Sequence, residues 1–273
     1  MTAGLLRFDA VDSHDPQACI DFLDFAASLA GVQDARRRAR EQLQLQPGHR
    51  VLEIGCGTGA DACELARLVA PRGHVVGVDL SQAMVDVASR RSELLGLPVE
   101  FRQADVRALP FPDESFDACY IDRVLHFLDS PLAALQEVIR VTRVGGRIAV
   151  REPDWSTLKT SGGDPLLDAR MTTAWCARAR DGSAAVGARL PRLFAEAGLL
   201  LETIRPSTIG VGQVATAKYL FRLDVAIRFA VASGALDRDD AKAWLVLARA
   251  GENAGTWRCE LSDATAIGVR PHA

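Results

Sequence analysis

Five apolar segments alternate with helical patterns in the first 150 residues, and this alternation restricts the fold more than any other feature. Turn residues bound each segment, as is typical of buried strands. The expected strands are 50–54, 74–79, 99–102, 116–121 and 146–151, and the expected helices are 60–70, 81–95 and 131–143. Strands that alternate with helices pair in parallel through right-handed crossovers. The sequence therefore predicts a doubly wound, Rossmann-like α/β sheet with its binding crevice at the carboxyl ends of the strands.

The rest of the chain departs from this alternation. Helices are expected at 15–44, 187–198, 214–234 and 238–250, a strand at 199–210, and an edge strand at 257–271. Asp237 is a candidate N-cap of the last helix. The predicted parts are an N-terminal helical cap segment at 1–44, a ligand-binding core at 45–153, a cap insertion at 154–186, and the C-terminal part of the core at 187–273 with a helical insertion at 213–256. The segments outside the alternating pattern are expected to cover the crevice as a substrate cap.

Composition narrows the kind of ligand. The 273 residues have a net charge of −3, and their 32 basic and 35 acidic residues are interspersed, so no nucleic-acid partner is expected. No apolar run reaches the ~20 residues needed to cross a bilayer, and the first residues lack a signal-peptide pattern. Six scattered cysteines lack the spacing of a metal site, which favours buried thiols in a reducing compartment. We expect a cytoplasmic protein with a small-molecule ligand and no metal, and we leave a homodimer open.

The stretch VLEIGCGTG, residues 51–59, predicts a strand that enters a glycine turn. Gly55, Gly57 and Gly59 would let the backbone approach a ligand closely, because a Cβ atom there would obstruct it. The spacing alone leaves a dinucleotide open, since GxGxxA turns also occur in dinucleotide folds. Glu53 favours a different ligand, because a carboxylate beside the turn would repel a pyrophosphate and suits a cation. Thr58 could bond the ligand or cap the next helix.

Two further acidic residues follow the second and third expected strands. Asp79 is placed to accept hydrogen bonds from both hydroxyls of a ribose. Ser81 is expected to cap a helix whose Met84 could pack on an adenine. Asp105 and the backbone amide of Val106 could bind the exocyclic amine and a ring nitrogen of adenine. Acidic residues at three successive strand ends, with no lysine for a phosphate, predict a nucleoside that carries positive charge.

Four segments in this order resemble class I S-adenosylmethionine-dependent methyltransferases of the branch similar to ubiquinone and menaquinone C-methyltransferases. They are VLEIGCGTG, VVGVDLSQAMVDVA, QADVRALPFPDESFDACYIDRVLHFLDSP and ALQEVIRVTRVGGRIAVREPDW. The resemblance covers about residues 45–155 and fades over 156–186 and 213–256. It implies a seven-stranded sheet with the last strand antiparallel, and S-adenosyl-L-methionine, converted to S-adenosyl-L-homocysteine, across the first two strand ends. The expected cofactor-binding residues are Glu53, Gly55, Gly57, Thr58, Gly59, Asp79, Leu80, Met84, Asp105, Val106, Asp122 and Arg123.

A catalytic base is harder to assign. Relatives often read RVLQH where this chain has RVLHF, so its histidine stands one place early, and one residue rotates a helical side chain by about 100°. His126 is nevertheless the first candidate base because it follows strand four and histidine is a common general base, and Asp122 is the second. A lone histidine among apolar neighbours is also a common structural group. The basic run 36–38 could pair with the donor's carboxylate or form a solvated face, and Asp61 is expected to face solvent.

The chemistry expected from the resemblance is SN2 transfer of a methyl group to an O, N or C nucleophile of a small molecule. Orientation of the acceptor can supply ~7 to 11 kcal/mol, and a base is needed only when the acceptor must lose a proton. One alternative is a protein of this fold that uses S-adenosylmethionine for a cyclisation or an alkyl transfer. A non-catalytic partner is another, and an NAD-dependent oxidoreductase is disfavoured by Glu53.

Overall fold

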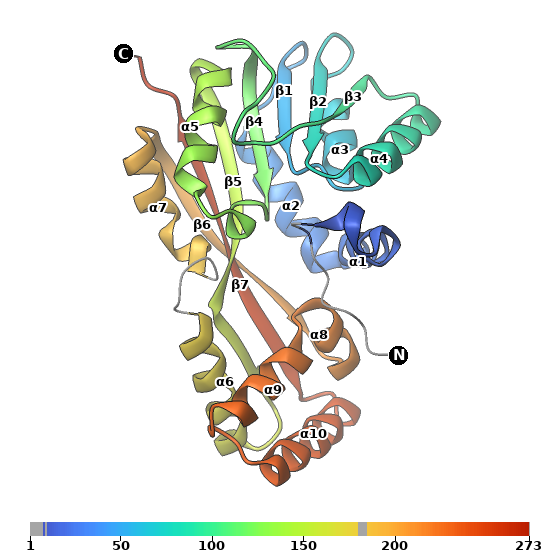
Figure 1. Ribbon diagram of the computed structural model, residues 1–273, viewed down its shortest axis with the longest axis vertical. Helices are drawn as coiled ribbons and strands as arrows, with labels where there is room; N and C mark the ends of the chain where they lie inside the picture. The colour runs from blue at the N-terminus through green and yellow to red at the C-terminus, as the bar shows by residue number, and fades with distance from the viewer. Residues whose placement is uncertain (1–7, 9, 180–184, 273) are drawn as a thin grey trace. The chain divides into compact units, whose positions relative to one another are not determined.

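The computed structural model describes residue 8, residues 10–179 and residues 185–272. Its strands form a seven-stranded sheet of order β3-β2-β1-β4-β5-β7-β6 (Figure 1). The strands are β1 Arg50–Ile54, β2 His74–Asp79, β3 Val99–Gln103, β4 Phe116–Asp122, β5 Thr142–Ser161, β6 Leu200–Val211 and β7 Arg258–Val269. The first five are parallel to one another and β7 is antiparallel, which confirms the predicted α/β class and sheet.

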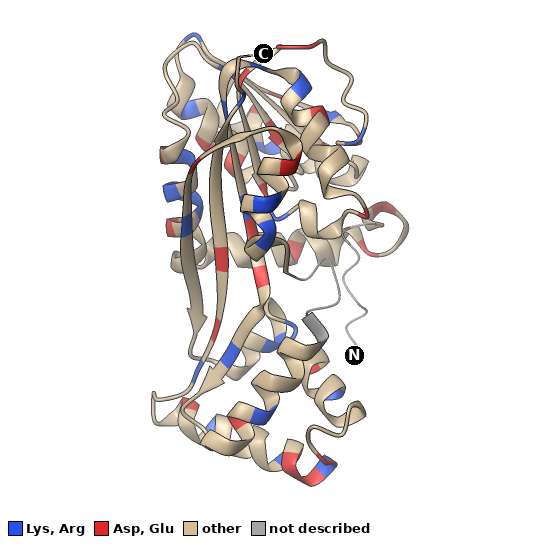
Figure 2. Ribbon diagram, turned by 90° about the vertical axis from the view of Figure 1, so that its left-hand side faces the viewer, with Lys and Arg blue, Asp and Glu red and all other residues tan. Residues whose placement is uncertain are grey.

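Helices connect the strands as the alternation predicts. The helical elements are η1 Val11–Ser13, α1 Pro16–Ser28, α2 Ala30–Gln42, α3 Ala60–Val69, α4 Gln82–Leu95, η2 Leu125–Phe127, α5 Pro131–Val141, α6 Pro165–Ala179, α7 Val186–Ala197, α8 Val214–Leu220, α9 Leu223–Ala232 and α10 Arg238–Asn253. None of the described helices is long and apolar enough to cross a membrane. Basic and acidic positions are interspersed along the helices (Figure 2).

The chain divides into two compact units. Unit 1 comprises Met1–Glu152, Arg189–Arg205 and Thr265–Ala273, and unit 2 comprises Pro153–Ala188 and Pro206–Ala264. The four boundaries between the units fall inside β5, α7, β6 and β7. The predicted insertions at 154–186 and 213–256 lie in unit 2, whereas the segment 1–44 lies in unit 1. A role of any of these segments as a substrate cap stays a prediction.

The centre of unit 1 is built around β1. Val51 and Leu52 are fully buried and pair with Val75 and Val76 of β2 on one side. On the other side β1 pairs with Ala118 and its neighbours in β4. Strands that are buried on both faces read as continuous apolar runs, which is why these segments were recognisable in the sequence. The pairing brings the carboxyl ends of β1, β2 and β4 to one edge of the sheet.

Unit 2 has a buried carboxylate of its own. Asp168, on α6, is 5% exposed and accepts hydrogen bonds from Trp244 Nε1 on α10 at 2.8 Å and from Thr160 Oγ1 at 2.9 Å. The backbone amide of Gly163 donates to the same carboxylate at 3.2 Å. These bonds join α6, α10 and the end of β5, and they satisfy a group that would otherwise be costly to bury.

Three sequence expectations about the elements are corrected. The helical segment 15–44 is two helices that meet at Leu29, whose backbone is extended, and 214–234 is interrupted at Arg222, where φ is +53°. The C-terminal strand is not at an edge, because β7 lies between β5 and β6 and leaves β6 as the edge strand. Apolar periodicity does not reveal a single-residue break or the order in which strands insert into a sheet.

The predicted N-cap Asp237 is confirmed, since its side chain accepts the amides of Asp239 and Asp240 at the start of α10. We expect Asp237→Ala to lower the free energy of unfolding by about 1 kcal/mol, because these two amides lose their partner. Equilibrium urea unfolding measures the change. Asp239→Ala is the matched control, since Asp239 is exposed and bonds only Lys242 among the interactions described for its side chain. Equal losses in the two variants would refute the capping role.

Candidate functional site

The three glycines of the turn after β1 all have a left-handed backbone conformation. Gly55, Gly57 and Gly59 have φ values of +66°, +50° and +81°, a region that side-chain-bearing residues rarely adopt. A Cβ atom on Gly57 would lie 2.9 Å from Leu23 Cδ1 of α1, and one on Gly59 would lie 2.9 Å from Ala88 Cβ of α4. Glycine is therefore required twice over, by the backbone conformation and by the close approach of neighbouring helices.

Asp79 links the end of β2 to this turn. Its Oδ2 accepts the amide of Gly57 at 2.9 Å and its Oδ1 accepts the amide of Ser81 at 2.9 Å. Burial raises the pKa of Asp79, and the backbone hydrogen bonds oppose that rise. Ser81 caps α4 as predicted, by accepting the amide of Met84 at 3.2 Å. The side chain of Asp12 accepts hydrogen bonds from the Ser81 hydroxyl and from the amide of Gln82.

The N-terminal helix α1 and η1 lie against the same end of unit 1. Met84 is 1% exposed and packs with Val11, Cys19 and Ile20. Thr58 does not cap α3, because the N-cap is Gly59 and no side chain bonds the first turn. The Thr58 hydroxyl instead donates to Asp24 at 3.4 Å. A contact between Met84 and an adenine stays a prediction.

The third acidic position is more open than the second. Asp105 accepts hydrogen bonds from Arg107, the shortest at 2.6 Å from Nη2, and these bonds lower its pKa. Val106 is buried and Leu80 is 53% exposed. Asp79 therefore bonds the glycine turn, whereas the Asp105 carboxylate forms a partly exposed ion pair with Arg107. A role of Asp105 toward an adenine stays a prediction.

A buried ion-pair cluster lies beneath the ends of β1 and β4. Asp122, at the end of β4, accepts Arg151 Nε at 2.7 Å through Oδ1 and Arg36 Nε at 2.8 Å through Oδ2. Burial alone would raise the pKa of Asp122, but the charges of Arg151 and Arg36 outweigh it and lower that pKa from 3.8 to about 2. Asp122 is thus held as a carboxylate by two arginines, which makes it a poor proton acceptor at neutral pH.

Asp61 belongs to the same cluster, so the expectation that it faces solvent is wrong. It is 4% exposed, forms an ion pair with Arg40, and lies 3.2 Å from Arg36 Nε. Arg36 and Arg40 are four residues apart and therefore share one face of α2. Arg37 and Arg38 lie on the other face with half or more of their side chains exposed. The basic run is thus divided between a buried and a solvated face, a division that depends on the helix register.

Two buried side chains beside this cluster each have a polar atom without a hydrogen-bond partner among the described residues. Glu53 is 3% exposed and its Oε2 is unbonded, as is the hydroxyl of Tyr120, the residue paired with Glu53 on β4. Burial raises the pKa of Glu53 well above its usual range, and the charge of Asp61 adds to that rise. A buried acceptor with no donor is costly, and it marks a position that a cationic donor would satisfy.

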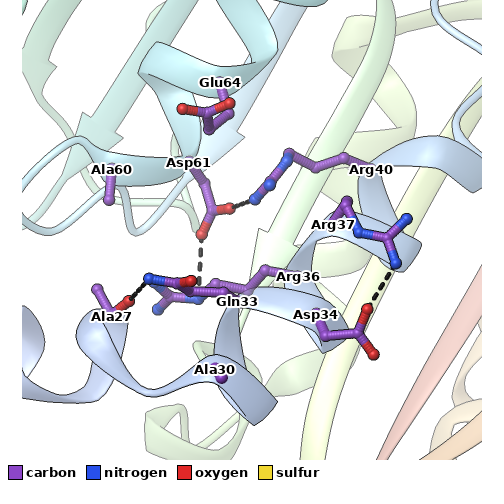
Figure 3. A pocket seen from close by; sticks show the side chains of 10 residues that line it. All are labelled: Ala27, Ala30, Gln33, Asp34, Arg36, Arg37, Arg40, Ala60, Asp61 and Glu64. Carbon is purple, nitrogen blue, oxygen red and sulfur yellow. Dashed lines mark hydrogen bonds and ion pairs between the residues drawn. The ribbon is translucent and has the colours of Figure 1, made fainter.

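A polar hollow of about 550 Å³ opens beside this cluster at the start of α3 (Figure 3). The side chains of Arg36 and Arg40 extend from α2 to Asp61. Arg37 forms a separate ion pair with Asp34 on the same helix. The lining residues are Ala27, Ala30, Gln33, Asp34, Arg36, Arg37, Arg40, Ala60, Asp61 and Glu64. Opposite charges share its walls, so the hollow suits a group that carries both a positive and a negative charge. Among the described residues no cluster of acidic, histidine or cysteine side chains could hold a metal ion.

The turn after β4 carries the candidate base. Arg123 has φ +60°, and its amide donates to the carbonyl of Arg151 at 2.8 Å. His126 Nδ1 lies 2.7 Å from Oε2 of Glu152, and the His126 side chain is 12% exposed. Sequence reasoning missed Glu152 and the partner role of Arg151. Their only signal was a charged pair directly after the apolar run 148–150, in the middle of β5.

Comparisons with known proteins agree with this geometry. Residues 52–150 match the family model described as a methyltransferase domain. These residues form a methyltransferase domain. The chain is 33% identical over 229 residues to a 37.1 kDa protein in transposon TN4556 of Streptomyces fradiae, covering 83% of this chain and 65% of that protein. It is 39% identical over 130 residues to a demethylmenaquinone methyltransferase of Thermus thermophilus, covering 48% of this chain and 57% of that enzyme.

Solved structures share the fold of this chain at low sequence identity. The [4+2]-cyclase SpnF is 22% identical with a TM-score of 0.57, and the match covers 89% of this chain and 82% of that one. A phosphoethanolamine N-methyltransferase of Haemonchus contortus, in complex with S-adenosyl-L-methionine, is 15% identical with a TM-score of 0.60, covering 98% and 61%. The chain spans less than two thirds of the length of the curated relatives named above.

We expect Glu53→Gln to raise the free energy of unfolding at pH 8 by about 1 to 3 kcal/mol, the range for an unsatisfied buried polar group. Because its folded pKa is raised, Glu53 contributes stability only while protonated, fully below its ordinary pKa, and this is lost as pH rises through the folded value. Glutamine mimics the protonated form, so the gain should vanish near pH 4. Urea unfolding at both pH values tests this. Glu64→Gln, at an exposed carboxylate, is the control.

Asp122→Asn should have the opposite effect and lower the free energy of unfolding at pH 7 by about 2 kcal/mol or more. The depressed folded pKa gives stability that is present above the ordinary value of 3.8 and lost as pH falls toward about 2. The difference from the wild type should therefore shrink over that pH range. Asp113→Asn is the control, because Asp113 is exposed and paired with Arg140 at the surface. A difference that does not change with pH would contradict the assignment.

Proposed function

We propose that this protein transfers a methyl group from S-adenosyl-L-methionine to a small-molecule acceptor. The observation that carries the proposal is the unbonded, buried Oε2 of Glu53 beneath a left-handed glycine turn. A bound cation would favour the charged form of Glu53, which burial disfavours, so the ammonium of the donor suits this position better than a phosphate does. Membership of residues 52–150 in the methyltransferase family supports the same donor.

The residues present fit the parts of that donor. The proposed contacts of its amino-acid end are Glu53, the Gly55–Gly59 turn and the buried face of α2, where Arg36 lies at the polar hollow. Asp79 is proposed to hold the ribose, since each of its oxygens accepts one backbone amide and keeps capacity for a hydroxyl. Met84, Asp105, Val106 and Leu80 are proposed for the adenine. Asp122 and Arg123 are proposed to position the donor from the end of β4.

The bound donor would supply a methyl group on a sulfonium, which is already a good leaving group. The side chains of the protein would then orient the acceptor and remove a proton from an acceptor that must lose one. We propose His126 as that base, and we rank Asp122 below it because two arginines hold its carboxylate. The acceptor class is a small molecule, as the names of the quinone and phosphoethanolamine methyltransferase relatives suggest.

A direct assay uses donor with a labelled methyl group together with reduced demethylmenaquinone or phosphoethanolamine as acceptors. Label in a product supports methyl transfer. The fold is also found in a [4+2]-cyclase, so a cyclisation that needs bound donor is the second candidate. Tight donor binding without labelled product for any acceptor would favour that candidate or a non-catalytic role over ours.

We expect Asp79→Asn to weaken binding of S-adenosyl-L-homocysteine by about 1 to 3 kcal/mol, because a charged acceptor for the ribose hydroxyls is lost. Isothermal titration calorimetry measures the change. Asp86→Asn is the matched control, since Asp86 is an exposed carboxylate on the adjacent helix α4 that bonds only Gln82 among the interactions described for it. Unchanged affinity in Asp79→Asn would refute the proposed ribose site.

A further inference from the structure

Glu152 ends the part of β5 that belongs to unit 1, and it is fully buried. Its Oε1 accepts the backbone amides of Val124 at 2.8 Å and Leu125 at 2.7 Å. Its Oε2 lies 2.7 Å from Nδ1 of His126. One carboxylate on β5 thus contacts three successive residues of the turn after β4.

The two oxygens of Glu152 have separate partners. Anchoring the turn to β5 uses Oε1 alone, because both backbone amides bond that atom. Oε2 has the imidazole as its described partner, so anchoring does not explain it. A carboxylate has only acceptor sites, so a hydrogen bond at Oε2 requires His126 Nδ1 to carry the proton. In the neutral ring the lone pair then lies on Nε2.

We propose that Glu152 is a positioning residue that holds His126 as the Nδ1–H tautomer and thereby makes Nε2 the proton-accepting atom of the site. This inference rests on the proposed function of His126 as a base. It assigns a role to a residue outside the cofactor contacts, and it explains why a carboxylate is buried in the middle of β5, since a buried charge needs such partners.

The surrounding turn restricts the ring further. Arg123 holds a left-handed backbone conformation that is rare for a residue with a side chain, and its amide is bonded to Arg151. The His126 ring lies 4.0 Å from that of Phe127, centroid to centroid, and Phe127 lies 5.7 Å from Phe8. With Nδ1 bonded and the ring 12% exposed, the imidazole has little freedom to rotate.

The proposed step transfers the methyl group to the acceptor atom and moves one proton from that atom to His126. As the acceptor atom forms a bond to the methyl carbon, the carbon–sulfur bond breaks and sulfur keeps its electron pair. The proton that the acceptor atom loses passes to Nε2 of His126. The resulting imidazolium keeps Nδ1–H bonded to the Glu152 carboxylate, which stabilises the positive charge, and it returns the proton to water afterwards.

Nitrogen-15 NMR of protein labelled at its five histidines tests the tautomer without any acceptor. His126→Gln identifies the His126 signals by their loss. In the unprotonated wild-type ring we expect a protonated, pyrrole-like Nδ1 and a bare, pyridine-like Nε2. A bare Nδ1 would overturn the proposal, whether it arises from a protonated Glu152 or from an absent hydrogen bond.

Glu152→Gln provides a second, independent test. The amide oxygen can keep the two backbone amides, so the amide nitrogen must then face His126 and donate to Nδ1. The tautomer should reverse, with the proton on Nε2. A folded Glu152→Gln protein that retains the Nδ1–H tautomer would contradict the inference. Asp168→Asn is the matched control, because it also converts a buried carboxylate to an amide, in unit 2, and should leave the His126 signals unchanged.

Activity and cofactor binding separate this inference from the proposed function. With an acceptor that must lose a proton, Glu152→Gln and His126→Gln should each reduce kcat by about 10²-fold or more, and the double variant should lose little beyond either. Calorimetric affinity for S-adenosyl-L-homocysteine should be unchanged in Glu152→Gln. If the wild type fails to bind this product, the proposed function fails whatever the tautomer. If binding persists and the two losses in kcat multiply, the link between Glu152 and His126 fails alone.

Discussion

The salt bridges of Asp122 connect the main parts of unit 1. One buried carboxylate at the end of β4 bonds Arg151 of β5 on one side and Arg36 of α2 on the other. The N-terminal helix pair is thereby fixed to the central strands, and Arg36 in turn reaches Asp61 at the start of α3. Because a buried ion pair is costly to break once formed, these contacts define one arrangement of α2, α3 and the strand ends.

Glu53 and Asp122 have different electrostatic surroundings, although both lie in the carboxyl-terminal part of a strand. Glu53 lies near Asp61 and keeps an unbonded oxygen, so its charge is disfavoured. Asp122 lies between two arginines, so its charge is favoured. A site with both kinds of carboxylate can discriminate a cation at one position while it keeps a fixed negative charge at another. Burial alone would raise the pKa of both carboxylates.

The sequence predicted the sheet well because its strands are continuous apolar runs between turn residues, and it located the turn after β1 because three glycines follow that run. It failed where an answer depended on helix register or on contacts between distant residues. Asp61 was expected in solvent, since nothing local reveals that Arg36 and Arg40 face it from α2. Glu152 was overlooked, because its partners lie 26 to 28 residues earlier in the chain. The edge position of β6 likewise depends on where β7 inserts.

The glycine turn has a further consequence for binding. Glycine loses more conformational entropy on folding than any other residue, and here that loss is borne by the folded chain before a ligand arrives. Asp79 accepts the amide of Gly57, and Leu23 and Ala88 pack closely against Gly57 and Gly59. A ligand that enters such a preorganised turn need not order it, so more of its contact energy remains as affinity. The free energy of folding of unit 1 would thus cover the entropy cost of ordering the turn, a cost that a flexible turn would subtract from the affinity for a ligand.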